Sequence, residues 1–102
     1  MAKYAIAAGE MMSSVSIYTT RFCPYCVQAK RLLGDKGVDY DEIAVDGNSA
    51  LRQKMMKLSG RHTVPQIWIG QTHVGGFDDL WALDRAGKLD TLLAASSNPV
   101  NP

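Results

Sequence analysis

The sequence lacks several features that mark other classes of protein. Its formal net charge is only +1, so neither a nucleic-acid surface nor a membrane-binding face is indicated. No apolar run approaches the roughly 18 residues that span a bilayer, and no segment is repeated. With 102 residues, the chain has room for one domain with one core. A single small domain is therefore expected, and its chemistry has to be sought in short motifs.

The first 14 residues also lack a targeting signal. Their apolar run, residues 4–8, is shorter than the roughly 7–15 residues of a secretory signal core. Met11 and Met12 directly precede the first strand pattern, so we interpret residues 1–14 as an N-terminal extension, vector-derived or translated from an upstream start. Without a signal peptide, the expected compartment is the reducing cytoplasm. A cysteine pair there is more often catalytic or metal-binding than structural.

The only two cysteines form one motif, Cys23-Pro24-Tyr25-Cys26, where a β-branched run over residues 15–20 gives way to a helical pattern. A thiol pair at a strand-to-helix junction is the redox signature of a thioredoxin-like fold. The unpaired N–H groups and partial positive charge of a helix N-terminus favour thiolate over thiol. Pro24 suits the first helical position. Cys23 is thus predicted to be the exposed nucleophile at the N-cap, and Cys26 the sheltered resolving thiol.

The rest of the chain alternates between strand and helix patterns. Gly70-Gln71 has the form of a type II′ hairpin turn, and Asp78 is the predicted N-cap of the helix that follows the hairpin. The predicted strands are 15–19, 38–45, 66–69 and 72–74, and the predicted helices are 24–36, 49–59, 77–86 and 88–95.

This order predicts an α/β fold of the β-α-β-α-β-β-α type, a four-stranded mixed sheet with helices on both faces. Leu51, Met55 and Leu58 are expected to share one face of the second helix. The domain is expected to span residues 15–95, and residues 96–102 are expected to form a disordered polar tail.

Two histidines raise the question of a metal site. Cysteine and histidine side chains together can hold zinc in a tetrahedral site. His62 and His73 stand too far from each other, and from Cys26, for a zinc finger. No metal ligand is therefore predicted.

Three motifs occur in register at the ends of the predicted elements: the Cys23–Cys26 motif, Thr63-Val64-Pro65, and Gly75-Gly76-Phe77-Asp78-Asp79. Together they resemble a dithiol glutaredoxin of the small bacterial class, over roughly residues 15–93. The resemblance implies a thioredoxin-like fold and a glutathione-dependent thiol–disulfide oxidoreductase. Glutathione is then a co-substrate, and no tightly bound cofactor is expected.

The resemblance also implies a role for each motif. Cys23 attacks a disulfide or a glutathionylated protein, and Cys26 resolves the mixed disulfide on the dithiol route. The residues alone leave a cis and an ordinary trans turn at Pro65 equally open, and the resemblance favours cis, with the Val64 backbone pairing with glutathione. The implied glutathione contacts are Arg21, Tyr25, Arg61, Thr63, Val64, Pro65, Gly76, Phe77, Asp78 and Asp79.

Several of these assignments have alternatives. Asp78 can cap its helix as well as bind the γ-glutamyl amine. The family usually places a lysine three residues before the first cysteine, where this chain has Thr20, so Arg21 and Arg61 both stand as partners for the glycyl carboxylate. Tyr25 is either a wall of the glutathione groove or an exposed loop side chain.

Two other functions compete with this one. A thioredoxin-like reductant served by a reductase protein fits the glutathione motifs less well. An iron–sulfur carrier that joins two protomers is disfavoured, because such family members usually have glycine or serine where this chain has Pro24 or Cys26. Disulfide-bonded or glutathionylated proteins, with ribonucleotide reductase among them, are the partners that the resemblance implies. A monomer is expected.

Overall fold

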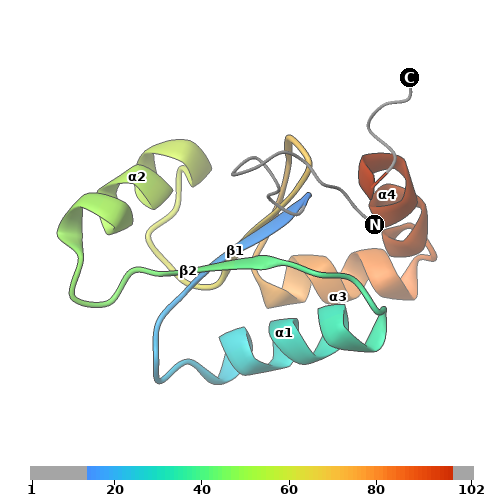
Figure 1. The fold of residues 1–102 in the computed structure, drawn as a ribbon, viewed down its shortest axis with the longest axis horizontal. Helices are drawn as coiled ribbons and strands as arrows, with labels where there is room; N and C mark the ends of the chain where they lie inside the picture. The colour runs from blue at the N-terminus through green and yellow to red at the C-terminus, as the bar shows by residue number, and fades with distance from the viewer. Residues whose placement is uncertain (1–13, 98–102) are drawn as a thin grey trace.

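The computed structural model describes residues 14–97, which form a four-stranded sheet and four helices (Figure 1). The strand order is β2-β1-β3-β4, with β1 and β2 parallel and the other neighbouring pairs antiparallel. In chain order the elements are β1 (Val15–Thr19), α1 (Pro24–Asp35), β2 (Asp41–Ala44), α2 (Ser49–Ser59), β3 (Gln66–Ile69), β4 (Thr72–Gly75), α3 (Phe77–Arg85) and α4 (Leu89–Ser97). The predicted mixed sheet is therefore confirmed, with α4 as a last short helix.

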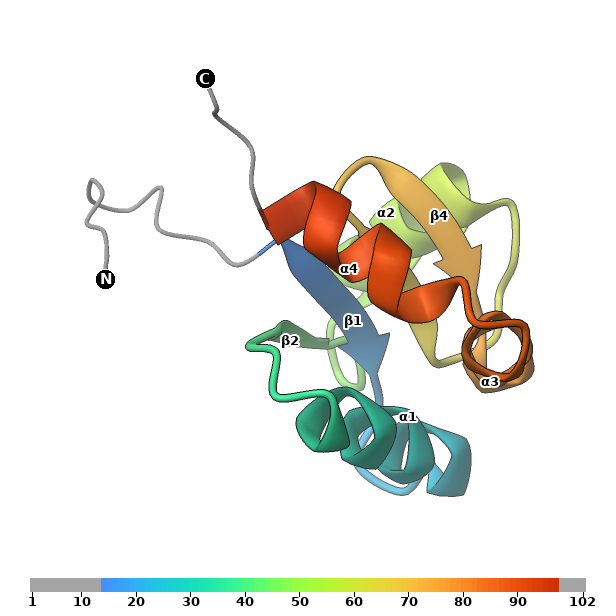
Figure 2. The ribbon, with the colours of Figure 1, turned by 90° about the vertical axis from the view of Figure 1, so that its right-hand side faces the viewer.

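Helices cover both faces of the sheet. Successive strand residues point to opposite sides, so neighbouring residues of β1 belong to two different cores. Ile17 packs in a core with residues of α1, α3 and α4, among them Leu33 and Leu80. Its neighbour Tyr18 faces the other way and packs with Met55 of α2. Figures 1 and 2 show α2 on the side of the strands opposite to α1. No helix within residues 14–97 is long and apolar enough to span a membrane.

The second strand is shorter than predicted. It begins at Asp41, which pairs with Ser16, and not at Val38. The N–H of Val38 instead bonds to the carbonyl of Leu33 at the end of α1, and Gly37 has a positive φ of 72°. Val38 therefore completes the helix C-terminus before the chain turns toward the sheet.

The face of α2 that carries Leu51, Met55 and Leu58 is only partly buried. Met55 is fully covered and Leu51 is half-buried, whereas Leu58 is 56 % exposed. The second core is a small cluster centred on Tyr18, Val45 and Met55, which leaves the last turn of the helix outside it. Leu58 thus lies at the exposed end of the face that it shares with Leu51 and Met55.

The last helix is longer than predicted, since it continues through Ser97 instead of ending at Ala95. Ser96 Oγ lies 3.1 Å from Ser14 Oγ and 3.3 Å from the Leu93 carbonyl oxygen, so these contacts hold the helix end against the start of β1. Residues 96 and 97 therefore do not belong to a tail. The rest of the predicted tail, 98–102, and residues 1–13 of the predicted extension lie outside the described residues.

Candidate active site

Cys23 lies between the end of β1 and the start of α1, as the sequence predicted. It is the N-cap of α1, with extended backbone (φ −127°), and Pro24 follows at the first helical position. The Cys23 Sγ accepts the N–H of Cys26 at 3.0 Å. No acidic side chain stands in the first turn of α1. The positive end of this helix is therefore directed at the sulfur of Cys23.

The two thiols differ in environment. Both cysteines are free, and their exposed fractions are 9 % for Cys23 and 1 % for Cys26. Cys23 is thus more covered than the predicted exposed nucleophile, because its Sγ lies against the Val64 carbonyl oxygen at 3.7 Å. Burial, and then the hydrogen bond with Cys23, raise the pKa of Cys26 to about 12. Cys26 is therefore a neutral thiol at ordinary pH.

A cis peptide bond joins Val64 to Pro65, so the cis geometry is confirmed of the two that the sequence left open. The loop that contains this bond faces the start of α1 and brings the Val64 carbonyl to Cys23. Thr63 is exposed and Pro65 is buried. The backbone of Val64 thus lies where it can pair with the backbone of a peptide bound to Cys23.

Gln66 and His73 support the cis-proline loop through hydrogen bonds, and the sequence analysis assigned neither residue to the site. Gln66 is fully buried, and its amide Nε2 donates to the carbonyl and hydroxyl oxygens of Thr63 at 3.1 and 3.3 Å. A carbonyl only accepts, so Gln66 Oε1 faces His73 Nε2, 2.7 Å away, and that nitrogen carries the hydrogen. The only sequence signal was a polar residue directly after Pro65 in a buried strand.

The N-terminus of α3 is built differently from the prediction. Its N-cap is Gly76, and Asp78 is an exposed residue in the first turn. The carboxylate of Asp79 accepts the Gly76 N–H at 2.9 Å. The prediction of Asp78 as N-cap was wrong, because the strand already ends at Gly75 and the helix begins two residues earlier than a cap at Asp78 requires.

Gly75 is required where it stands. Its φ is +114°, a conformation that side chains rarely adopt, and a Cβ there would collide with the Asp79 carboxylate and approach Arg61. At the next residue, a Cβ on Gly76 would lie 3.5 Å from the Pro65 carbonyl oxygen. The glycine pair therefore brings the start of α3 beside the cis-proline loop.

The two candidate cations lie in different places. Arg61 Nη1 is 3.0 Å from Asp79 Oδ2, at the start of α3. The Gly76 N–H and then Arg61 hold the pKa of Asp79 below its usual value. Arg21 is 78 % exposed and binds Asp46 through its backbone N–H and its Nε, at 3.1 and 3.2 Å. The structure therefore brings Arg61, and not Arg21, to the Asp79 side of the site.

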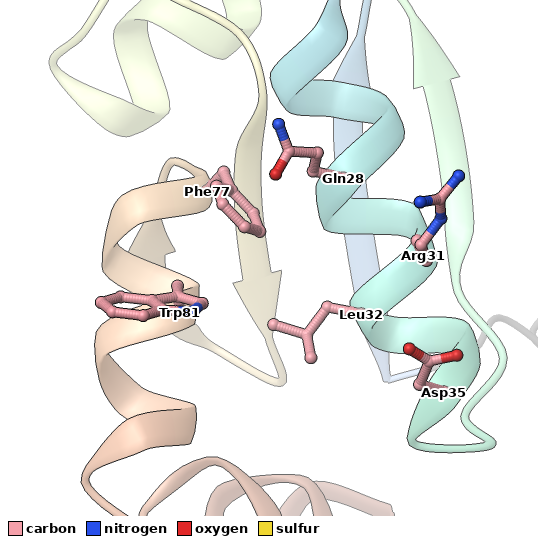
Figure 3. A pocket seen from close by; sticks show the side chains of 6 residues that line it. All are labelled: Gln28, Arg31, Leu32, Asp35, Phe77 and Trp81. Carbon is pink, nitrogen blue, oxygen red and sulfur yellow. The ribbon is translucent and has the colours of Figure 1, made fainter.

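Aromatic side chains border the site. Phe22 and Tyr25, on either side of Cys23, are 92 % and 57 % exposed. Phe77 and Trp81 of α3 and Leu32 of α1 line a groove of about 230 Å³, and Figure 3 shows the two helices on either side of it. Phe77, the first residue of α3, therefore also lines this groove. Within residues 14–97 no three His, Cys, Asp or Glu side chains gather closely enough to hold a metal ion.

A CxxC dithiol at a helix N-terminus, opposite a cis-proline loop in a four-stranded α/β fold, is the site of a thiol–disulfide oxidoreductase of the thioredoxin-like class. The comparisons narrow the class. Residues 15–74 match the glutaredoxin family model. The chain belongs to the glutaredoxin family and is a thiol–disulfide oxidoreductase.

Relatives and solved structures agree with this assignment. The chain is 63 % identical to a glutaredoxin of Pseudomonas aeruginosa, over 82 % of this chain and 100 % of the relative. It is 57 % identical to glutaredoxin 3 of Escherichia coli K12, over 80 % and 99 %. The structure is similar to that of a buckwheat glutaredoxin–glutathione complex, with a TM-score of 0.77 and 29 % identity over 82 % of this chain and 79 % of that one.

Proposed function

We propose that this chain reduces protein disulfides and glutathione mixed disulfides with glutathione as the electron donor. The observation that carries the proposal is the position of the Cys23 Sγ, which lies at the N-terminus of α1 and against the Val64 carbonyl of the cis-proline loop. A peptide with a central thiol can join its sulfur to Cys23 and its backbone to Val64 at the same time. Glutathione is such a peptide, and the similar buckwheat glutaredoxin was crystallised with it.

The γ-glutamyl end of glutathione fits the start of α3. This end carries a carboxylate and an ammonium. The backbone N–H groups of Phe77 and Asp78, in the first turn of the helix, suit the carboxylate. The carboxylates of Asp78 and Asp79 suit the ammonium. Thr63, Pro65 and Gly76 then form the floor between this end and Cys23, and Tyr25 forms a wall.

The glycyl carboxylate requires a cation, and we assign it to Arg61 in preference to Arg21. Arg61 directly precedes the cis-proline loop and lies on a half-exposed carboxylate, that of Asp79. When the ligand ammonium replaces Arg61 as the partner of the Asp79 carboxylate, the Arg61 guanidinium can turn to the glycyl carboxylate. Arg21 instead has both its backbone N–H and its Nε on Asp46.

The chemistry follows from the two sulfurs. The Cys23 thiolate attacks the glutathione sulfur of a mixed disulfide, and the protein thiolate leaves and takes a proton. A second glutathione thiolate then attacks this sulfur, which forms oxidised glutathione and restores Cys23. On a protein disulfide, the Cys23 thiolate attacks one substrate sulfur, and the other leaves as a thiolate and takes a proton. Cys26 then attacks the Cys23 sulfur and releases the second substrate thiol, which leaves a Cys23–Cys26 disulfide for two glutathiones to reduce.

The test is glutathione-dependent reduction of a small mixed disulfide, coupled to glutathione reductase and NADPH. Cys23→Ser should be inactive, because it lacks the nucleophile, whereas Cys26→Ser should keep substantial activity, because this route needs only Cys23. A parallel assay replaces glutathione with a thioredoxin reductase. A wild type that ignores glutathione and accepts electrons from that reductase contradicts the proposal.

A further inference from the structure

A chain of polar contacts joins the helix of Cys26 to β2, whereas the cis-proline loop precedes β3 on the other side of β1. Lys30 stands one turn after Cys26 on α1, and its Nζ donates to Glu42 Oε2 of β2 at 2.9 Å. The Thr19 hydroxyl, at the end of β1, donates to the same oxygen at 2.7 Å. Thr19 is buried, with 1 % of its surface exposed. Residues four apart on a helix are neighbours on one face, so Lys30 and Cys26 share a face of α1.

These contacts fix the charge of Lys30 as well as its position. Its hydrogen bond to Glu42 raises the pKa of Lys30, so the ammonium keeps its proton. Lys30 and then Thr19 lower the pKa of Glu42, so the carboxylate stays ionised. Besides Glu42, Tyr40 and Cys26 are ionisable neighbours of Lys30. Glu42 of β2, which also accepts the Thr19 hydroxyl of β1, thus holds the Lys30 ammonium in place.

Cys26 is the group that can use this charge. As a resolving thiol it must react as a thiolate, yet its burial opposes ionisation. Cys23 adds to that opposition, whereas the Thr20 backbone and Lys30 act in the other direction. Lys30 is therefore the positively charged side chain that counteracts the burial of Cys26.

We propose that Lys30, held in place by Glu42 and Thr19, is a positioning residue for the resolving step, in which its ammonium stabilises the developing thiolate of Cys26. This inference rests on the proposed role of Cys26. The route that needs only Cys23 should not depend on Lys30. Lys30 therefore separates the dithiol route from the glutathione-only route.

The step balances without a further reactant. The Cys26 thiol gives its proton to solvent, its sulfur bonds to the Cys23 sulfur, and the bond from Cys23 to the substrate sulfur breaks. The substrate leaves as a thiolate and takes a proton from solvent. Lys30 neither gives nor takes a proton, because Glu42 keeps it in the ammonium form.

The test uses a neutral aromatic disulfide, 4,4′-dithiodipyridine, in stopped flow with the reduced full chain and no glutathione. Cys23 attacks the reagent first and releases one thiopyridone in a phase whose rate depends on reagent concentration. Cys26 then displaces the second thiopyridone in a unimolecular phase. Lys30→Met should slow the second phase about fivefold, as expected for the loss of one partly screened charge. The first phase should not change.

Four variants complete the design. Lys30→Arg keeps the charge and should restore the second phase, which a merely structural role of Lys30 would not predict. Lys30→Gln, a second neutral variant, should behave as Lys30→Met does and replaces it if the methionine variant unfolds. Lys54→Met, at an exposed lysine of α2, should leave both phases unchanged. Cys26→Ser should release only the first thiopyridone.

The outcomes separate the two ideas. A second phase of unchanged rate in folded Lys30→Met or Lys30→Gln overturns the role of Lys30, and so does a second phase that is equally slow in Lys30→Arg. If Cys26→Ser still releases both equivalents at the wild-type rate, the proposed role of Cys26 fails instead. Neither result depends on whether glutathione is the physiological donor.

Discussion

Two helix N-termini meet at the cis-proline loop, and they are capped in opposite ways. At the start of α1 the Cys23 sulfur accepts a backbone N–H, and no acidic side chain stands in the first turn. At the start of α3 the carboxylate of Asp79 folds back onto the Gly76 N–H and also binds Arg61. The first helix leaves its positive end to the reacting sulfur, and the second neutralises part of its own.

The difference teaches how one fold separates chemistry from recognition. A helix N-terminus stabilises whichever negative group lies nearest to it. At α1 that group is the cysteine itself, so the helix supports reactivity. At α3 a charged pair already occupies the place, so a ligand with both an ammonium and a carboxylate can exchange partners with it. Each of the following predictions alters one of the two N-termini.

The largest effect is expected from Gly75→Ala, just before α3. The positive φ of Gly75 and the collision of a Cβ with Asp79 should lower the free energy of unfolding by about 2 kcal/mol. Urea denaturation measures this change. The matched control is Gly34→Ala in α1, where a Cβ meets nothing within 4 Å and the variant should gain about 0.5 kcal/mol. Equal effects of the two substitutions would contradict the assigned conformation of Gly75.

The second prediction concerns the charge that caps α3. Asp79→Asn removes the carboxylate that holds Gly76 and Arg61, so the KM for glutathione should rise about tenfold, with a smaller change in kcat. Asp78→Asn should raise the KM less, because Asp79 and not Asp78 carries these contacts. Asp39→Asn, an exposed charge on another loop, is the control for net charge. A KM that is equally insensitive to all three would remove Asp79 from the site.

The third prediction makes α1 resemble α3. Tyr25 stands at the second helical position of α1, and Tyr25→Asp places a carboxylate in the first turn of the helix that Cys23 caps. A negative charge there disfavours the thiolate, so alkylation of Cys23 by iodoacetamide should slow about fivefold at neutral pH. Tyr25→Asn, which removes the ring without adding charge, separates the two effects. An alkylation rate that is the same in both variants would show that charge at this helix end does not control the sulfur.

The smallest effect is the contribution of Asp79, at the start of α3, to the pH dependence of stability. The Gly76 N–H and Arg61 lower the pKa of Asp79 from its ordinary value of 3.8 in the folded chain. Its contribution is therefore present above pH 3.8 and is lost as the pH falls through the folded value. Because the side chain is 45 % exposed, the loss should be about 0.5 kcal/mol or less. Urea titrations at pH 7 and pH 3 should show a total loss that is smaller by this amount in Asp79→Asn than in wild type, because Glu42 and Asp46 contribute to both.

Local signals explain why the start of α1 was predictable. An N-cap cysteine followed by proline places the helix start within one residue, since both preferences arise from the first turn itself. At the start of α3 the predicted N-cap was Asp78, whereas the structure uses Gly76, two residues earlier. The choice of Gly76 depended on where β4 ends, and hence on its pairing with β3.

Long-range contacts account for the other residues that the sequence left undecided. Gln66 and His73 meet because β3 and β4 pair side by side, and no local pattern specifies that contact. The direction of Arg61 toward Asp79, and of Arg21 toward Asp46, likewise depends on elements distant in sequence. Long charged side chains have many rotamers, so only the packed fold selects one partner.

Sequence alone determined the class of protein and the place of its CxxC motif at a helix start, because such a motif and alternating strand and helix patterns are properties of neighbouring residues. The tertiary structure decided how covered each thiol is, which carboxylate caps α3 and which cation joins it. It also placed the charge of Lys30, which two strands hold on the face of Cys26. Those features depend on contacts between residues far apart in the chain, and such contacts exist only after the sheet has formed.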